Sequence, residues 1–154
     1  MPTTPTIETH ATTRHPALRV MWAGLAVTVL AGAAPLLDLV TTGTIEAHVR
    51  ETYPSWSDDW VRGDTTGLAV GLAIIGLLGV VGWLVSIQAT RRAWRWARGL
   101  TTGLWLVAVA VALFVALAPA EPYERLAPAG IAALTALPCV AGFVAVVQLW
   151  RHRP

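Results

Sequence analysis

Ten residues in the middle of the chain, from Thr90 to Gly99, combine the side chains of several kinds of binding surface. In a nucleic-acid site, aromatic rings stack on bases while arginines contact the phosphates. In a membrane protein, the same residue types anchor a turn at the level of the lipid headgroups. The arginines here are Arg91, Arg92, Arg95 and Arg98, and the tryptophans are Trp94 and Trp96. The flanking segments decide between these two uses.

Four flanking and neighbouring segments are apolar enough to cross a membrane, which takes about 20 residues in a helix. They are residues 20–40, 65–88, 100–119 and 128–150. The sequence is 55% hydrophobic and only 13% charged. A soluble fold would have to bury four helices with almost no polar face, which 154 residues cannot cover. We therefore predict an all-α protein built as a four-helix transmembrane bundle.

The remaining segments divide the chain around this single domain, which we place at residues 17–150. Residues 1–16 are rich in Thr and Pro and almost free of apolar side chains, so we expect a disordered tail. We expect a loop at 41–64 on the far side of the membrane from the tail. A short turn at 89–99 and the end at 151–154 should lie on the same side as the tail.

The arginines are distributed unequally between the two sides of the predicted bundle. All of them except Arg50, Arg62 and Arg125 fall in the tail and first-span entry, the turn at 89–99 or the C-terminal end. Short basic loops stay in the cytoplasm, so this bias predicts both termini in the cytoplasm and a plasma-membrane protein. Ala31-Gly32-Ala33 is similar to a signal-peptide cleavage site. However, the apolar run continues past it and Pro35 follows closely, which favours a retained span.

The segment Thr90–Gly99 is then a short cytoplasmic turn between two spans. We predict that Trp94 and Trp96 lie in the interfacial aromatic belt. Arg91, Arg95 and Arg98 share one helical face and can reach anionic headgroups. So short a turn offers no groove or platform for a nucleic acid, and we expect none as a partner.

Asp38 is the only charged residue inside a predicted span, and ionisable groups in a bilayer are often functional. It lies near the end of the first span that faces the loop at 41–64. It can form an ion pair with Arg50, Arg62 or Arg125, cap that loop, or belong to a ligand or proton site. We therefore treat Asp38, Arg50 and Arg125 as a candidate ligand or ion-pair group.

Other chemistry has little support in the sequence. The four histidines lie outside the predicted spans, and Cys139 is the only cysteine, so neither haem ligation nor a dithiol site is indicated. No GxSxG, HExxH or Walker A motif is present. We predict no enzyme activity, no cofactor and no metal site.

The second span is rich in glycine, which lets helix backbones approach closely in a membrane. We expect these glycines to pack helices together, either within the bundle or against a second subunit. They are Gly67, Gly71, Gly76, Gly79 and Gly82.

The loop at 41–64 contains the pattern of a short amphipathic helix. Ile45, Val49 and Thr52 recur at helical spacing, and Glu46 and Arg50 form an i,i+4 pair. Pro54 ends this pattern. We expect a structured cap over the bundle, with a partner or ligand surface as the alternative.

The run YPSWSDDW, then GLLGVVGWLVSIQATRRAWRWARG, then LWLVAVAVALF, resembles small four-helix integral membrane proteins of high-GC actinobacteria. The resemblance covers roughly residues 17–150 and is mostly compositional. It implies the four-span architecture and an actinobacterial source, and it carries over no catalytic or binding residues.

These features together favour a non-enzymatic structural or accessory membrane protein. Such a protein would pack with itself, as a homo-oligomer, or with a membrane-protein partner. The alternative is a transporter, or a membrane protein that binds a small ligand or lipid, with its site around Asp38.

Overall fold

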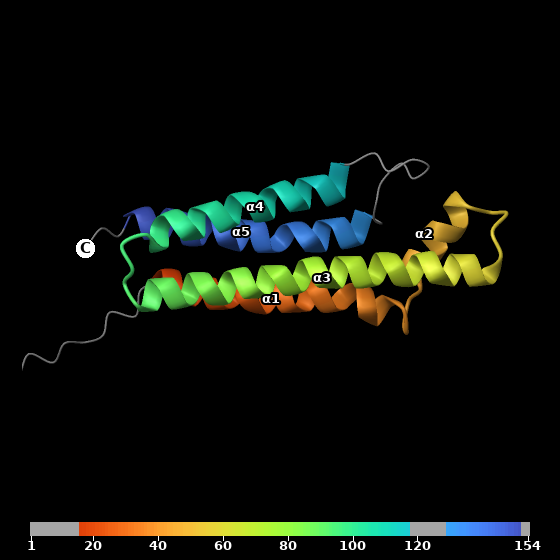
Figure 1. The fold of residues 1–154 in the computed structure, drawn as a ribbon, viewed down its shortest axis with the longest axis horizontal. Helices are drawn as coiled ribbons and strands as arrows, with labels where there is room; N and C mark the ends of the chain where they lie inside the picture. Colours follow the sequence, from red (N-terminus) through yellow and green to blue (C-terminus); the bar gives the residue numbers. More distant parts are fainter. Residues whose placement is uncertain (1–15, 118–128, 152–154) are drawn as a thin grey trace, which may run out of the picture.

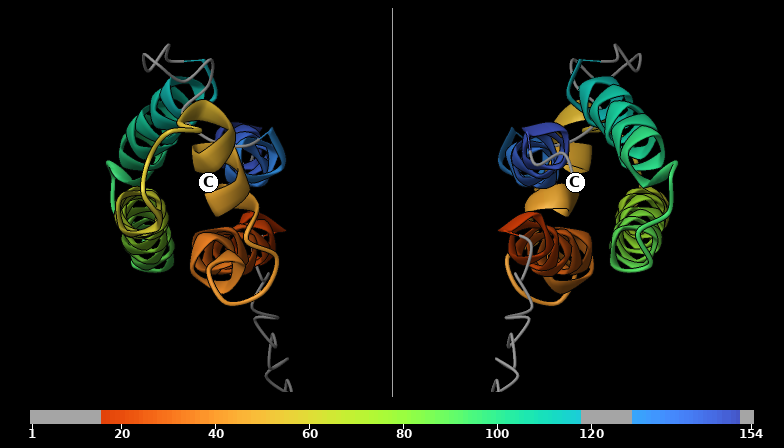
Figure 2. Two further views of the ribbon diagram at one scale, coloured as in Figure 1. Left: turned by 90° about the vertical axis from the view of Figure 1, so that its right-hand side faces the viewer. Right: turned by 90° about the vertical axis from the view of Figure 1, so that its left-hand side faces the viewer.

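The computed structural model describes residues 16–117 and 129–151, and within these ranges every regular element is a helix. The elements are α1 (Pro16–Asp38), α2 (Thr44–Thr52), α3 (Asp58–Arg91), α4 (Ala97–Leu117) and α5 (Ala129–Arg151). The four long helices lie side by side, and α2 lies at one end of them (Figures 1 and 2). The predicted all-α bundle with a partly helical loop after its first span is confirmed.

Four helices are long and apolar enough to cross a membrane: α1, α3, α4 and residues Gly130–Arg151 of α5. Their large apolar side chains point outward, so that Leu30, Leu77 and Phe114 are each more than half exposed. Small residues such as Ala69 and Ala89 are buried instead. This inside-out distribution suits a bundle whose solvent is hydrocarbon. The chain is a multi-pass membrane protein.

The helix α3 begins at Asp58, earlier than the predicted start of the span at residue 65. Ser57 precedes it in an extended conformation, and Asp58 and Asp59 lie in the first turn, where acidic side chains suit the helix dipole. Its 34 residues span about 51 Å, whereas the hydrocarbon core is about 30 Å thick. The polar first turns of α3 therefore project beyond the apolar part of the bundle.

The other boundaries also differ slightly from the predicted ranges. α1 begins at Pro16, which we had placed in the tail, and the turn between α3 and α4 is confined to residues 92–96. The rest of the predicted tail, the segment 118–128 and residues 152–154 lie outside the described residues.

Two glycines face each other where helices α1 and α3 pack together. A Cβ atom built on Gly76 would lie 2.5 Å from the Cα of Gly32, and one on Gly79 would lie 3.0 Å from Cγ2 of Thr28. The same construction on Gly67, Gly71 and Gly82 meets no atom within 4 Å. Of the glycines predicted to pack helices, two contact α1 and three border open space.

Two tryptophans also pack against glycines, each on a neighbouring helix. Trp83 of α3 packs onto Gly24 of α1, and Trp105 of α4 packs onto Gly142 of α5. α1 also packs along α5, whereas α3 and α4 have few contacts with each other. The helices α3 and α4 diverge from the turn that connects them, so that their separation increases towards the end of the bundle where α2 lies (Figure 1). The bundle is thus closed on three sides and looser between α3 and α4.

Candidate functional site

The carboxylate of Asp38 caps the start of α2. Its Oδ1 accepts a hydrogen bond from the backbone N–H of Thr44 at 3.1 Å, and its Oδ2 accepts one from the N–H of Ile45 at 2.8 Å. The hydroxyl of Thr42 donates to Oδ1 as well. The first N–H groups of a helix have no partner within it, and a carboxylate is a good acceptor for them. Asp38 is 8% exposed, and its oxygens are committed to this structural role.

The reversal of the chain between α1 and α2 depends on Gly43. Gly43 has a φ of 63°, the left-handed conformation that a residue without Cβ adopts most easily. Its own N–H donates to the carbonyl of Asp38 at 2.9 Å. This tight turn brings the first N–H groups of α2 back to the carboxylate at the end of α1.

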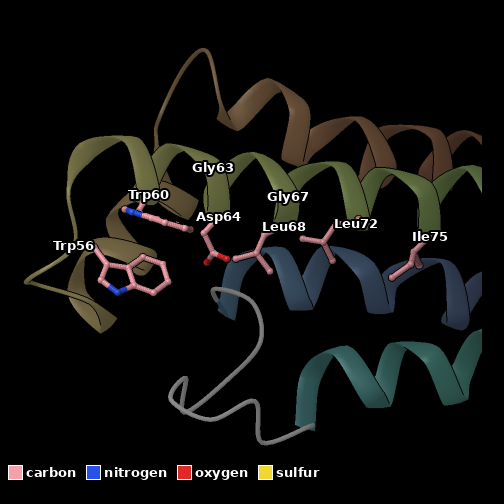
Figure 3. Close-up of a pocket in the computed structure, with 9 residues that line it drawn as sticks. Trp56, Trp60, Gly63, Asp64, Gly67, Leu68, Leu72 and Ile75 are labelled. Atoms are coloured by element: carbon pink, nitrogen blue, oxygen red, sulfur yellow. The ribbon is translucent and has the colours of Figure 1, made fainter.

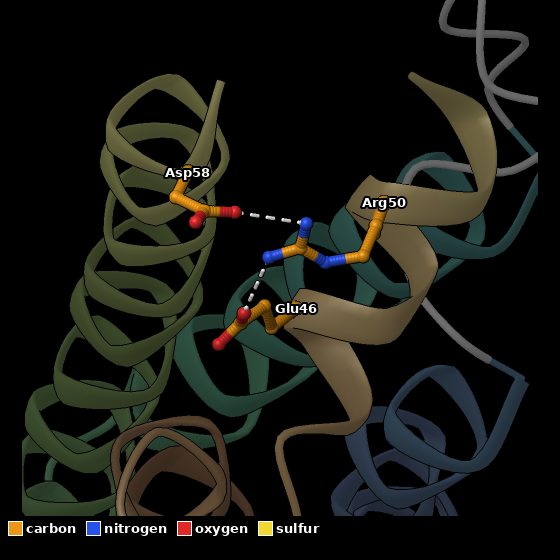
Figure 4. Close-up of polar contacts among 3 residues, drawn as sticks. All are labelled: Glu46, Arg50 and Asp58. Carbon is orange, nitrogen blue, oxygen red and sulfur yellow. Dashed lines mark hydrogen bonds and ion pairs between the residues drawn. The ribbon is translucent and has the colours of Figure 1, made fainter. Parts of the chain in front are cut away.

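Arg50 contacts other acidic residues than Asp38. It donates to Glu46 at 3.1 Å and to Asp58 at 3.0 Å (Figure 4). These hydrogen bonds raise the pKa of Arg50 above its usual value, so the guanidinium stays charged. Because Asp58 begins α3, Arg50 links α2 to α3. Arg125, the third member of the predicted ligand or ion-pair group, lies outside the described residues.

The underside of α2 closes the α2 end of the bundle. Ile45 and Val49 are fully buried. They belong to one apolar cluster with Val61 of α3, Val115 of α4 and Ile131 of α5. The expected cap over the bundle is therefore a helix held by Asp38 at its start, by Arg50 on its side and by apolar contacts beneath.

The arginine- and tryptophan-rich turn lies at the opposite end of the bundle. Trp94 and Trp96 stack with ring centroids 4.8 Å apart, and the guanidinium of Arg92 lies 5.9 Å from the ring centroid of Trp94. Arg91 and Arg95 are exposed, whereas Arg98 is half-buried. The predicted common helical face of these three arginines is wrong, because α3 ends at Arg91 and α4 begins only at Ala97. Stacked rings flanked by exposed arginines suit the headgroup region of a membrane.

The sequence did not reveal a cavity of about 250 Å³ that all four spans line. Two tryptophan N–H groups bridge helices beside it. Nε1 of Trp83 donates to Oγ1 of Thr28 at 2.8 Å, and Nε1 of Trp105 donates to the carbonyl of Cys139 at 2.9 Å. These bonds tie α3 to α1 and α4 to α5. The space between the two pairs stays open because small side chains face it, including Gly32, Gly79, Gly82, Ala108 and Ala112.

Few polar groups line this cavity, and two of its threonine hydroxyls donate hydrogen bonds to carbonyl groups of their own helices. Thr28 donates to the carbonyl of Gly24, and Thr135 donates to that of Ile131. The hydroxyl of Thr101 differs because it is 5% exposed and has no hydrogen-bond partner in the structure. A buried hydroxyl without a partner is unfavourable by about 1–3 kcal/mol. The cavity is thus a largely apolar site.

The described residues contain no cluster of His, Cys, Asp and Glu that could hold a metal ion. The walls of the cavity are apolar side chains, hydroxyls and one thiol, Cys139, and none of them is charged. Such a site can bind an apolar molecule by contact and exclude water from it. It offers no acid–base pair for a reaction.

One signal in the sequence could have pointed to this cavity. Trp83 and Trp105 lie well inside their helices, away from the aromatic belts, and a buried indole N–H requires an acceptor. Tryptophan at such a depth indicates a bridge between helices. Which helix supplies the acceptor cannot be read from one sequence.

Comparison with known proteins finds no matching family, no matching curated protein and no matching solved structure. The resemblance to small actinobacterial membrane proteins therefore stays a prediction.

Proposed function

We propose that this is a non-enzymatic membrane protein that binds the apolar chain of a lipid or lipid-like molecule inside its bundle. The observation that carries the proposal is the cavity of about 250 Å³ lined by all four spans. The predicted alternative of a lipid or small-ligand site is thereby favoured, but at a new place. Asp38 does not serve this site because its carboxylate caps α2.

The surroundings of the cavity support a hydrocarbon occupant. An apolar cavity does not hold water well, because a water molecule needs two to four polar partners. Lipid tails surround the bundle on all sides and can enter where α3 and α4 have few contacts.

Glycines on α3 support a second candidate, an accessory subunit that packs against a membrane partner or a second copy of itself. Gly67 and Gly71 form a GxxxG pair, and no atom lies within 4 Å of a Cβ built on either. Such pairs let two membrane helices approach closely. The pair is not used for packing within the described part of this chain.

The experiment that distinguishes the two functions is intact-complex mass spectrometry of the full chain, purified from its membrane in a mild detergent. We expect one lipid-sized molecule bound per chain. A stoichiometric second protein chain without such a molecule would favour the accessory subunit. A bare monomer would contradict both proposals.

We also propose that both termini lie in the cytoplasm of a cell whose plasma membrane the bundle spans. The arginines of the turn at 92–96 and its neighbours, which can contact anionic headgroups, support this orientation. We expect alkaline phosphatase fused after Ser57 to be active and a fluorescent protein fused after Trp96 to fluoresce. The opposite pair of results would reverse the orientation.

A further inference from the structure

The end of the bundle that carries the turn between α3 and α4, which we name the turn end, contains arginines without acids. It comprises residues 16–24, 86–103 and 140–151, where α1 and α4 begin and α3 and α5 end (Figure 1). These described residues include no Asp or Glu. The arginines are all exposed except Arg98, which is half-buried: Arg19, Arg91, Arg92, Arg95, Arg98 and Arg151. The turn end therefore carries a positive charge that no carboxylate within it offsets.

The α2 end of the bundle has the opposite charge. Every acidic residue that the structure describes lies there: Asp38, Glu46, Glu51, Asp58, Asp59 and Asp64. Trp56 and Trp60 lie there too, and both line a hollow along α3 together with Asp64 (Figure 3). Tryptophans therefore occur at both ends of the bundle, and it is the charge near them that differs.

The backbone of the turn is held in one conformation. The N–H of Trp94 donates to the carbonyl of Ala89 at 3.1 Å, and the N–H of Ala93 donates to the carbonyl of Thr90 at 3.1 Å. Ala93 has a φ of 49°, the left-handed conformation that commonly ends a helix. The arginines before and after Ala93 are therefore presented from an ordered turn.

The turn also lies at the depth of the lipid headgroups. Trp94 and Trp96 are 38% and 57% exposed, and tryptophan prefers the boundary between hydrocarbon and water. The last exposed large apolar side chain of α3 is Val85. Arg91 follows it by about 9 Å along the helix, and the polar layer on each face of a bilayer is about 5–8 Å thick. The guanidinium groups of the turn can therefore reach lipid phosphates.

We propose that the turn end binds phospholipids with a net negative headgroup in preference to zwitterionic phospholipids. The exposed guanidinium groups of Arg91, Arg92 and Arg95 contact the phosphate, and the rings of Trp94 and Trp96 lie beside the glycerol. One arginine near an anionic surface contributes about fivefold in affinity. A zwitterionic headgroup gains less, because its ammonium group is repelled by the same arginines. This surface is separate from the cavity, and the inference goes beyond the proposed function.

The test compares phosphatidylglycerol with phosphatidylcholine, each spin-labelled near the headgroup on an identical chain. The full-length protein carrying Cys139→Ser and Gly99→Cys is labelled with bimane at residue 99 and reconstituted in vesicles of both lipids. Residue 99 is exposed at the start of α4, and a Cβ there meets no atom within 4 Å. A spin-labelled lipid that contacts the bimane quenches its fluorescence. We expect phosphatidylglycerol to associate there roughly tenfold more strongly than phosphatidylcholine.

The first control moves the bimane to the α2 end of the same protein. Val40→Cys replaces Gly99→Cys for this purpose, because Val40 is 79% exposed at that end. Quenching at residue 40 should show no preference for phosphatidylglycerol. Both leaflets contain both lipids, so the comparison does not depend on the orientation of the protein.

Two sets of variants assign the preference to particular arginines. Arg91→Gln, Arg92→Gln and Arg95→Gln combined should remove most of the preference at residue 99 while leaving quenching at residue 40 unchanged, which shows normal insertion. Arg62→Gln removes an exposed arginine of the α2 end and should keep the preference at residue 99. Sodium chloride at about 1 M, where the Debye length is about 3 Å, should also lower it.

Three results would overturn the inference. They are equal association of the two lipids at residue 99, an unchanged preference in the triple variant, and an equal preference for phosphatidylglycerol at residue 40. None of them concerns the lipid inside the bundle, which intact-complex mass spectrometry counts separately, so the proposed function and this inference can fail independently.

Discussion

Gly76→Leu is expected to separate α1 from α3 and to destabilise the bundle more than any other single glycine substitution in α3. A Cβ at this position would lie 2.5 Å from the backbone of Gly32, and a backbone cannot move aside as a flexible side chain does. We expect a loss of about 3 kcal/mol, the upper part of the usual range for overpacking. Unfolding of the purified protein by titration with sodium dodecyl sulfate measures it.

Gly82→Leu is the matched control for this prediction. It introduces the same side chain into the same helix, but a Cβ there meets no atom within 4 Å. Its free energy of unfolding should stay within about 1 kcal/mol of the wild-type value. The only expected change is a small gain, because leucine favours a helix slightly more than glycine does. Equal losses in the two variants would mean that α1 and α3 are not in contact at Gly32 and Gly76.

Asp38→Ala is expected to release α2 from the end of α1. The substitution removes the acceptor for the N–H groups of Thr44 and Ile45, and the N–H of Ile45 becomes unpaired at a buried site. We expect a loss of about 1–3 kcal/mol. Hydrogen exchange should show reduced protection at residues 44–52, with the four spans little affected.

The control for the Asp38 prediction is Asp59→Ala, which removes an exposed acid near the same end of the bundle. It should leave the exchange of α2 unchanged. Unchanged protection of α2 in Asp38→Ala, together with lost lipid binding, would contradict the capping role and restore Asp38 as part of a ligand site.

The spans were predictable because membrane helices are continuous apolar runs, and α2 was predictable from the spacing of Ile45 and Val49. The start of α3 was not, because the polar residues from Asp58 to Asp64 look like a loop to any measure of hydropathy. A helix that projects beyond the apolar core keeps its backbone hydrogen bonds without keeping the composition of a span.

The cavity was not predictable because it depends on which helix surfaces face each other. Gly67, Gly71, Gly76 and Gly82 are equivalent in sequence, yet only Gly76 of these four meets a backbone from α1. Likewise, the partner of Arg50 depends on where α3 begins, since Asp58 reaches it only as the first residue of that helix.

The measurement that tests the central claim most directly is the number of lipid molecules retained by Gly82→Leu and by Gly103→Leu. Gly82 borders the cavity, whereas Gly103 does not line it, and a Cβ fits at both positions. Retention by Gly82→Leu should fall roughly tenfold, as expected when about two methylene groups lose their contacts. Gly103→Leu should retain lipid as the wild type does. Equal retention in the two variants would show that the cavity is not where the lipid binds.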